Sequence, residues 1–207
     1  MGLSSIASNV GRSKKVNSEI ADIITFIESD WGLQMRLFPV QKVILKAHYG
    51  IPLEDKVPTI NLSDWRRESF RKITEAEYLQ YLYDNGRCNI ATVVEGKERR
   101  EMILSIGRRS GKTTISACIA AYETYKLISK GDPQAYYGLP HSNNIQIISV
   151  ATDKDQAGLL YQEVSGHYRN CSFFSPYTAN NTQSYARFQT PKDIERTGSY
   201  IDDPTAK

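Results

Sequence analysis

Cysteine and histidine are scarce in this sequence, and this limits the kinds of site that it can build. The 207 residues include three cysteines and three histidines. An odd number of widely spaced cysteines, at Cys88, Cys118 and Cys171, fits neither a disulfide framework nor the ligand spacing of a zinc site. We therefore expect free thiols in a reducing cytoplasm, and histidines with structural or surface roles.

Long apolar runs are also missing from the chain. No segment approaches the roughly 20 apolar residues of a membrane-spanning helix, and the N-terminus lacks the apolar centre of a signal peptide. Hydrophobic residues make up 40% of the chain and charged residues 24%, as in ordinary globular proteins. The net charge of +3 permits a nucleic-acid partner without arguing for one. We expect a globular protein with a substantial core and no membrane partner.

One segment joins an apolar run to a short loop and then to an amphipathic stretch. Residues 102–106 are apolar at most positions, residues 107–111 contain two glycines, and Lys-Thr-Thr follows at 112–114. This order predicts a strand, a phosphate-binding loop and a helix. Backbone N–H groups of the loop and of the helix N-terminus would surround a phosphate. Lys112 would reach the β- and γ-phosphates, and the hydroxyl of Thr113 would bind Mg²⁺.

This loop departs from the usual pattern G-x-x-x-x-G-K-[ST] at its first glycine. Counting back from Gly111 places that glycine at Ile106, whereas the chain has Gly107 one position later. An ordinary strand-to-helix turn would also need small residues, but it would leave Lys112 at a helix start, where a cation is mildly unfavourable. We therefore predict nucleotide binding, with ATP and Mg²⁺ as cofactors. The predicted nucleotide-binding residues of the loop are Gly107, Arg109, Ser110, Gly111, Lys112, Thr113 and Thr114.

A candidate contact for the base lies upstream, in the sequence Phe38-Pro39-Val40-Gln41. The proline predicts a helix start, which places Gln41 in the first turn. A glutamine amide carries a donor and an acceptor side by side, matching the exocyclic amine and ring nitrogen on one edge of adenine. An unpaired polar group there would cost about 1–3 kcal/mol, so the site would select adenine over guanine. A helical glutamine is more often a surface residue, but its position before a phosphate loop favours contact with adenine.

Three regions are expected along the chain. Residues 1–16 are rich in Ser, Gly, Asn and Lys and predict a flexible tail, whereas residues 17–50 predict helices that carry the glutamine motif. Residues 51–207 predict the N-terminal part of an ATPase domain. Helices are predicted over 17–31, from Pro39 onward, over 74–84 and 112–130, and after a cap at Thr152 or Asp153. Strands are predicted over 59–62, 90–94, 102–106, 145–151 and 186–190.

The order of strand, loop, helix, strand and helix predicts a βαβ crossover. We therefore expect an α/β fold, a P-loop NTPase core of the additional-strand type with a mainly parallel sheet flanked by helices. An ATPase also needs an apolar strand that ends in Asp with a neighbouring Glu. The late pair Asp202-Asp203 follows Ser-Tyr-Ile and precedes Pro204, which is not a buried strand, so it does not supply that element. We expect the core to be incomplete at its C-terminus, with the acidic strand following residue 207.

Four segments together resemble the large terminase subunit of tailed bacteriophages, the motor that pumps DNA into the procapsid. They are the glutamine motif at 38–41, the helix and turn at 74–89, the loop at 107–113, and the strand-to-helix step at 149–157. The loop is the most specific, because loops of this family lack the first glycine and carry an arginine. By position, Arg108 matches that arginine. The resemblance implies that Arg108 completes the γ-phosphate site as a catalytic residue beside Lys112, although the adjacent Arg109 could share the role or either could form a salt bridge.

The resemblance also implies a function and a setting. An ATPase subunit would translocate viral double-stranded DNA, with an endonuclease domain in the rest of a longer protein. Its partners would be duplex DNA, the portal protein, the small terminase subunit and further copies of itself in a ring. It would act in the host cytoplasm, transiently at the portal vertex of the procapsid. Two alternatives remain open: an ATPase like the superfamily 2 helicases and translocases, and a nucleotide-binding module without hydrolysis.

Overall fold

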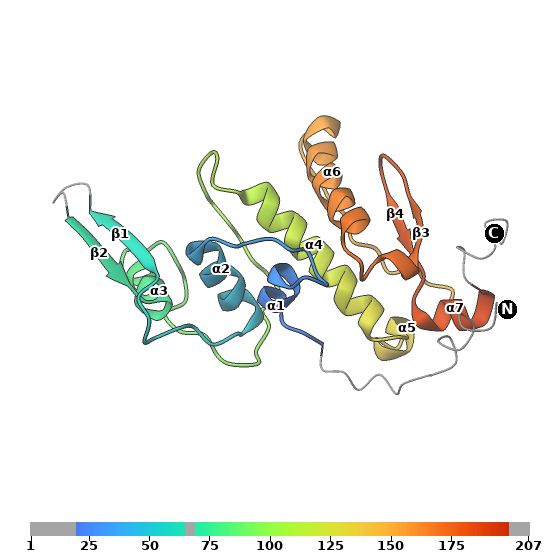
Figure 1. Ribbon diagram of the computed structural model, residues 1–207, viewed down its shortest axis with the longest axis horizontal. Helices are drawn as coiled ribbons and strands as arrows, with labels where there is room; N and C mark the ends of the chain where they lie inside the picture. Colours follow the sequence, from blue (N-terminus) through green and yellow to red (C-terminus); the bar gives the residue numbers. More distant parts are fainter. Residues whose placement is uncertain (1–19, 65–68, 199–207) are drawn as a thin grey trace, which may run out of the picture.

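A computed structural model describes residues 20–64 and 69–198 of the chain (Figure 1). The predicted tail at 1–16 and the pair Asp202-Asp203 lie outside these residues. The helices are α1 (Ile23–Glu28), α2 (Pro39–Tyr49), α3 (Glu75–Asp84), α4 (Lys112–Ser129), α5 (Pro133–Tyr136), α6 (Lys154–Asn170) and α7 (Pro191–Thr197), with a 3-10 turn η1 (Ser175–Tyr177). The strands are β1 (Ile60–Asp64), β2 (Ser69–Ile73), β3 (Thr178–Asn181) and β4 (Ala186–Phe188).

Helix α4 forms the centre of the larger hydrophobic core. Helices α1 and α6 pack against it, and α2 lies beside its first half (Figure 1). Phe26 of α1 is completely buried and stacks on Tyr125 of α4, with ring centroids 4.6 Å apart. Phe174, which follows α6, is also fully buried and meets Phe26 edge-on. Aromatic burial of this extent holds α1, α4 and the end of α6 together.

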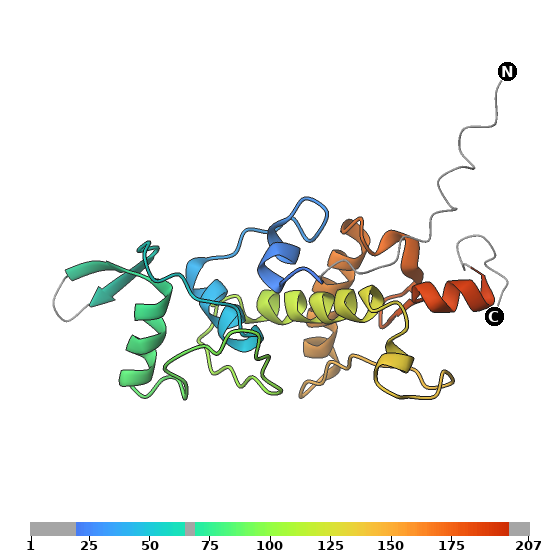
Figure 2. The same cartoon turned by 90° about the horizontal axis from the view of Figure 1, so that it is seen from below.

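A second, smaller core lies at one end of the molecule, where the β1–β2 hairpin covers α3 (Figures 1 and 2). Ile60 and Ile73 pair across the antiparallel hairpin and are buried with Leu79 of α3. Val43 of α2 belongs to the same cluster and therefore links it to the larger core. Within the described residues, β1 and β2 pair only with each other.

Local capping chemistry explains where several helices begin. The prediction of a helix over 74–84 is confirmed, because the Thr74 hydroxyl accepts from the Glu77 amide while the Glu77 carboxylate accepts from the Thr74 amide. Of the two predicted caps, Thr152 and Asp153, the structure uses Asp153 at the start of α6. The first predicted helix is much shorter than 17–31, because the Asp22 carboxylate accepts from the amides of Ile24 and Thr25 and thereby fixes the start of α1 at Ile23.

The predicted parallel sheet does not form in the part of the chain that the structure describes. Residues 90–94, 102–106 and 145–151 are irregular there, and the two sheets are antiparallel hairpins, β1 with β2 and β3 with β4. Side chains expected inside the sheet are exposed, including Ile103 at 93% and Val150 at 86%. A strand needs a neighbour that satisfies its backbone groups, and no described segment pairs with these apolar runs. The fold is therefore α/β only at a coarse level, with helices around small sheets.

Two shorter strands were predicted close to where they occur. The strand expected at 59–62 is found as β1, and the one at 186–190 as β4.

In residues 20–64 and 69–198, no helix combines the length and the apolar character that crossing a bilayer requires. The division of the chain into three regions stays a prediction.

Candidate nucleotide-binding site

Helix α4 begins directly after the predicted phosphate loop, and its first turn is open to an anion. Gly111 occupies the N-cap position in the left-handed conformation, with φ 76° and ψ 24°, and no side chain caps the helix. The first turn contains no acidic residue. The first amide groups of a helix lack partners within it and carry partial positive charge. The start of α4 therefore offers hydrogen-bond donors suited to a phosphate.

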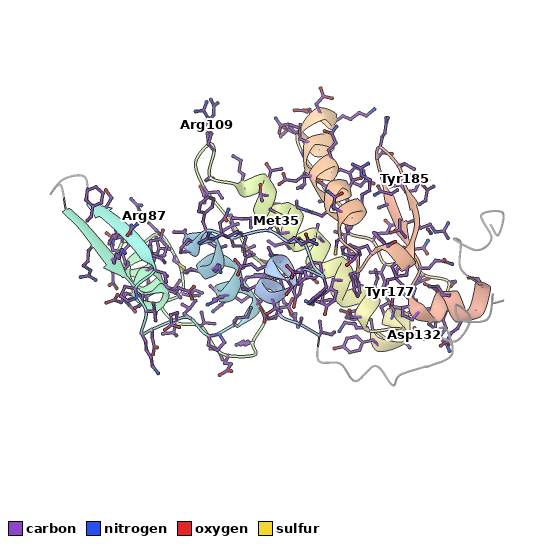
Figure 3. All side chains as sticks on the ribbon, in the orientation of Figure 1. Met35, Arg87, Arg109, Asp132, Tyr177 and Tyr185 are labelled. Carbon is purple, nitrogen blue, oxygen red and sulfur yellow. The ribbon has the colours of Figure 1, made fainter. Side chains whose placement is uncertain are left out.

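The loop itself is held by one internal hydrogen bond and contains one strained residue. The Ser110 hydroxyl donates to the carbonyl oxygen of Gly107 at 2.6 Å. Arg109 has φ 62°, a left-handed conformation that is costly for any residue with a Cβ atom. Figure 3 shows Arg109 at the tip of the loop, pointing away from the helices. The side chains of Arg108, Lys112 and Thr113 are also exposed, so they can reach a bound ligand.

Gln41 lies against this loop, although it is far away in the sequence. Its Oε1 atom accepts a hydrogen bond from the Phe38 amide at 2.9 Å, which orients the side chain across the start of α2. Its Nε2 atom lies 2.8 Å from the position that a Cβ atom would take at Gly111. The structure thus brings the predicted adenine contact next to the predicted phosphate site. Half-buried Thr114 lies in the first turn of α4, two residues beyond Lys112.

Helices α2 and α4 are tied together by a polar network that the sequence did not predict. The Tyr49 hydroxyl at the end of α2 donates to Glu123 of α4 at 2.7 Å. Lys126 donates to Glu98 at 2.7 Å and to Glu123 at 3.1 Å, so the turn that precedes the loop joins the same network. The spacing of Glu123 and Lys126 suits a helical ion pair, but nothing in the sequence indicates Tyr49 or Glu98 as partners.

Burial and charge change the pKa values within this network. Burial raises the pKa of the Tyr49 hydroxyl, and the negative charge of Glu123 raises it further. Burial acts to lower the pKa of Lys126, but the hydrogen bond to Glu98 and the charge of Glu123 raise it overall. At neutral pH both groups therefore keep their protons and remain donors. The network holds α2, and with it Gln41, in a fixed position relative to α4.

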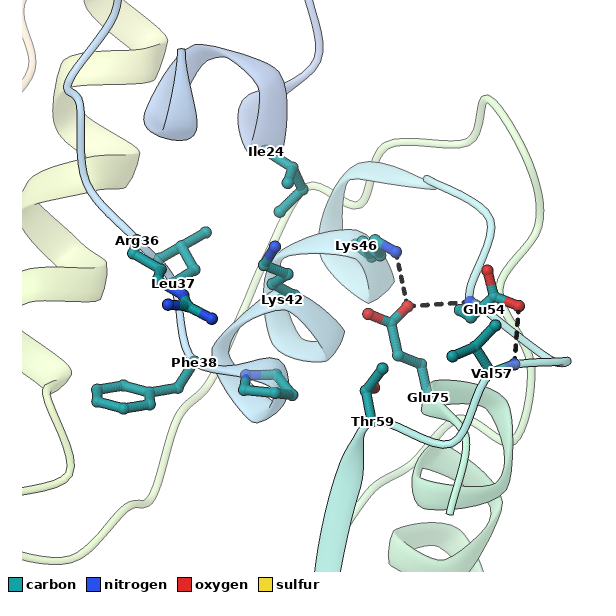
Figure 4. Close-up of a pocket in the computed structure, with 11 residues that line it drawn as sticks. Ile24, Arg36, Leu37, Phe38, Lys42, Lys46, Glu54, Val57, Thr59 and Glu75 are labelled. Atoms are coloured by element: carbon teal, nitrogen blue, oxygen red, sulfur yellow. Dashed lines mark hydrogen bonds and ion pairs between the residues drawn. The ribbon is translucent and has the colours of Figure 1, made fainter. Parts of the chain in front are cut away.

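A cavity of about 730 Å³ lies on the other side of α2 (Figure 4). Lys46 and Glu75 point toward one another across it and form an ion pair of 2.6 Å. Phe38 lines it, and its ring is 73% exposed. Neither Gln41 nor any residue of the phosphate loop lines this cavity. The helix start and the loop chemistry, rather than this cavity, mark the place where phosphates would bind.

The residues present fit nucleotide phosphates better than they fit a metal ion alone. Among the residues that the structure describes, no group of three His, Cys, Asp or Glu side chains could hold a metal. Thr113 offers a single hydroxyl oxygen. Magnesium in nucleotide sites is held largely by phosphates and water, with one or two carboxylates from the protein. Thr113 can therefore be one Mg²⁺ ligand beside the phosphates, and a carboxylate ligand is not supplied by the loop or the first turn of α4.

The sequence was also compared with known proteins. A family model described as the N-terminal P-loop domain of the uncharacterized protein MJ0330 matches residues 3–202, which is nearly the whole chain. No curated protein and no solved structure matches the chain. The family description names a P-loop and therefore indicates nucleotide binding. It names neither DNA packaging nor a terminase, so the resemblance to terminases stays a hypothesis, and the role of each site residue stays a prediction.

Proposed function

The chain belongs to this family of N-terminal P-loop domains, and we propose that it binds ATP with Mg²⁺ as the ATPase part of a motor that translocates duplex DNA. One observation carries the ATP site: the amide of Gln41 lies beside Gly111, at an uncapped helix start. A base contact and a phosphate cradle on neighbouring segments match the two ends of one adenine nucleotide. The motor and its DNA rest on the resemblance to terminases alone.

In this proposal the base binds at the start of α2. Gln41 donates a hydrogen bond from Nε2 to the adenine ring nitrogen. Its Oε1 atom accepts a hydrogen bond from the exocyclic amine at its second lone pair. The first lone pair is already used by the Phe38 amide, which fixes the orientation of the side chain. The exposed ring of Phe38 offers a face on which a purine can stack. A guanine would present a carbonyl oxygen where adenine has its amine, and the pairing would fail.

The phosphates bind at the loop and at the start of α4. Backbone amides from Gly107 to Thr114, including those of Ser110 and Gly111, surround the β- and γ-phosphates, and Lys112 adds a positive charge. Mg²⁺, when bound through Thr113, would neutralise part of the phosphate charge. Water attacks the γ-phosphorus, and ADP and phosphate leave. Arg108, with Arg109 beside it, stabilises the charge of the transferring group, an effect of about 10³–10⁵ in rate where an arginine acts in this way.

Other parts of the proposal also come from the resemblance alone. The acidic residue that aligns the attacking water lies on a later strand. Duplex DNA, the portal protein, the small terminase subunit and further copies of the chain in a ring are the partners. The setting is the host cytoplasm and, transiently, the portal vertex of a procapsid. The contacts to duplex DNA would involve its phosphates rather than its bases.

The proposal is tested by separating nucleotide binding from turnover. Binding of fluorescent ATP and GTP analogues is measured for the chain and for Lys112→Ala and Gln41→Ala. We expect Lys112→Ala to weaken both nucleotides, and Gln41→Ala to reduce the preference for ATP. Failure of the unaltered chain to bind ATP would overturn the proposal.

Turnover then distinguishes the motor from its alternatives. We expect ATP hydrolysis that linear duplex DNA stimulates in a longer protein containing this chain, and that Lys112→Ala abolishes. Strand separation driven by ATP would favour the helicase alternative. Tight ATP binding without turnover in either protein would favour the module without hydrolysis. Robust turnover by the 207-residue chain alone would show that the catalytic acid lies within it.

A further inference from the structure

The β1–β2 hairpin lies at one end of the molecule, and the elements that the structure describes cover one of its faces (Figures 1 and 2). The covered face carries Ile60 and Ile73, which are 3% and 1% exposed and pack with Leu79 of α3. Side chains along a strand alternate between the two faces. The neighbours of these residues in each strand therefore lie on the opposite face, which no described element covers.

The outward face combines an aromatic ring, a cation and two small polar groups. Phe70 lies opposite Ser63, and Lys72 lies opposite Asn61. All four are exposed, and Phe70 is 82% exposed although its ring is apolar. Alternation places Phe70 and Lys72 on the same face, two residues apart, which is about 6.6 Å along a strand. Among the side chains described on this face there is no carboxylate.

A second cation, Arg71, lies between Phe70 and Lys72 in β2, so the same alternation places it on the covered side of the hairpin, where its ion pair is weak. The guanidinium of Arg71 is 3.8 Å from Glu77, and the two side chains are 71% and 53% exposed. An ion pair this long and this exposed contributes little, because water screens it. Arg71 therefore keeps most of its positive charge exposed at the hairpin without lying on the outward face.

We propose that this outward face binds single-stranded nucleic acid. Phe70 stacks on one base, while Lys72 contacts a phosphate of the same strand and Arg71 adds positive charge to the hairpin. Proteins that bind single strands combine these two features, a cationic surface and aromatic rings that stack on bases. The bases of a duplex stack on one another, so an exposed ring finds a free base face only on a single strand. Residues 65–68 between the strands are not part of the site, and binding needs no ATP, so the inference does not rest on the proposed function.

The test is the affinity of the full chain for a labelled single-stranded oligonucleotide of mixed sequence, measured by fluorescence anisotropy at several salt concentrations without nucleotide. We expect Phe70→Ala to weaken binding by about tenfold, as loss of one stacked base does. We expect Lys72→Ala to reduce the slope of log affinity against log salt by about 0.7, the value for one phosphate contact on a single strand. The same sequence as a duplex should bind more weakly and respond less to Phe70→Ala.

Two exposed residues provide matched controls. Tyr83→Ala removes an exposed ring from α3 in the same lobe, and Lys97→Ala removes an exposed cation elsewhere. Neither should change the affinity for the single strand. The proposal is overturned if the unaltered chain does not bind the oligonucleotide, or if Phe70→Ala binds as tightly as the unaltered chain. An equal loss in Tyr83→Ala, or an equal effect of Phe70→Ala on duplex and single strand, would also overturn it.

Discussion

The side-chain nitrogen of Gln41 lies so close to Gly111 that a Cβ atom there would push it aside. The added atom would be 2.8 Å from Nε2, and the backbone at Gly111 has φ 76°, which residues with a side chain rarely adopt. The left-handed backbone therefore favours glycine at the start of α4, and a Cβ atom there would also displace the side chain of Gln41. This position is also where the amide of Gln41 and the first turn of α4 meet.

Replacing this glycine should damage the site, whereas replacing a glycine outside the loop should not. We expect Gly111→Ala to lower the free energy of unfolding by about 1–2 kcal/mol, because alanine in the left-handed region is strained. Displacement of Gln41 should also weaken ATP binding by about tenfold, which corresponds to about 1.4 kcal/mol. Gly158→Ala in α6 is the control, because a Cβ atom there meets nothing within 4 Å and the residue lies outside the site. Urea unfolding and titration with an ATP analogue measure both effects, and equal losses in the two variants would contradict this account.

Removing one hydroxyl should loosen the connection between α2 and α4. We expect Tyr49→Phe to destabilise the fold by about 1.5–3 kcal/mol, as the loss of a hydrogen bond to a charged group does. A double-mutant cycle with Glu123→Gln isolates the pair, and we expect a coupling energy of at least 0.5 kcal/mol, roughly the lower end for residues in contact. Tyr83→Phe, at an exposed position, should leave stability unchanged. A coupling energy near zero would mean that the network does not join the helices.

Stability should fall as the pH drops below neutrality. Burial lowers the pKa of His48 below its ordinary value of about 6.5, although Glu98 and Glu123 oppose this effect. Burial lowers the pKa of His167 in the same way. Both rings therefore bind a proton more readily in the unfolded chain, so unfolding takes up protons at and below about pH 6.5. The stability present at higher pH is lost as the pH falls through this range.

Thermal unfolding at a series of pH values checks this prediction. We expect the melting temperature to decline from pH 7 toward pH 5.5, and the decline to become shallower in His48→Gln. His167→Gln should make the decline shallower as well, because burial lowers the pKa of His167 in the same direction. A melting temperature that rises on acidification would contradict the sign derived from burial.

Truncation of Phe26 and truncation of Phe70 should have very different effects on the free energy of unfolding. Phe26 is completely buried and stacks on Tyr125, so we expect Phe26→Ala to lower the free energy of unfolding by about 3–5 kcal/mol. Phe70 is 82% exposed, so Phe70→Ala should change it by less than about 0.5 kcal/mol. Urea unfolding of both variants measures the difference. A large loss in Phe70→Ala would show that the outward face of the hairpin is covered after all.

The sequence predicted the local features of this fold much better than its long-range pairing. A capping box is legible in four consecutive residues, so the start of α3 at Glu75 followed directly from Thr74 and Glu77. The predictions of strands at 102–106 and 145–151 were wrong. An apolar run indicates that a segment avoids water, but it does not show that another strand will pair with it. β2 was missed because Phe70, Arg71 and Lys72 are all exposed and give no alternating pattern.

The candidate site shows the same contrast between local features, which were predictable, and long-range hydrogen bonds, which were not. The loop and the uncapped start of α4 were predictable from glycine and lysine spacing, since each involves only adjacent residues. The position of Gln41 beside the loop was expected because of the order of motifs, and the structure does place it there. The bond between Tyr49 and Glu123 joins residues 74 positions apart, and no spacing rule reaches that far.

The network of Tyr49, Glu123, Lys126 and Glu98 has a consequence for the entropy of binding. It connects the helix that would hold a base to the helix that would hold phosphates, and both helices contribute to one aromatic core. The distance between the base-binding and phosphate-binding positions is therefore already set before a ligand binds. A nucleotide that spans them would need to order only the loop between Gly107 and Gly111, so most of its contact energy would be available as affinity.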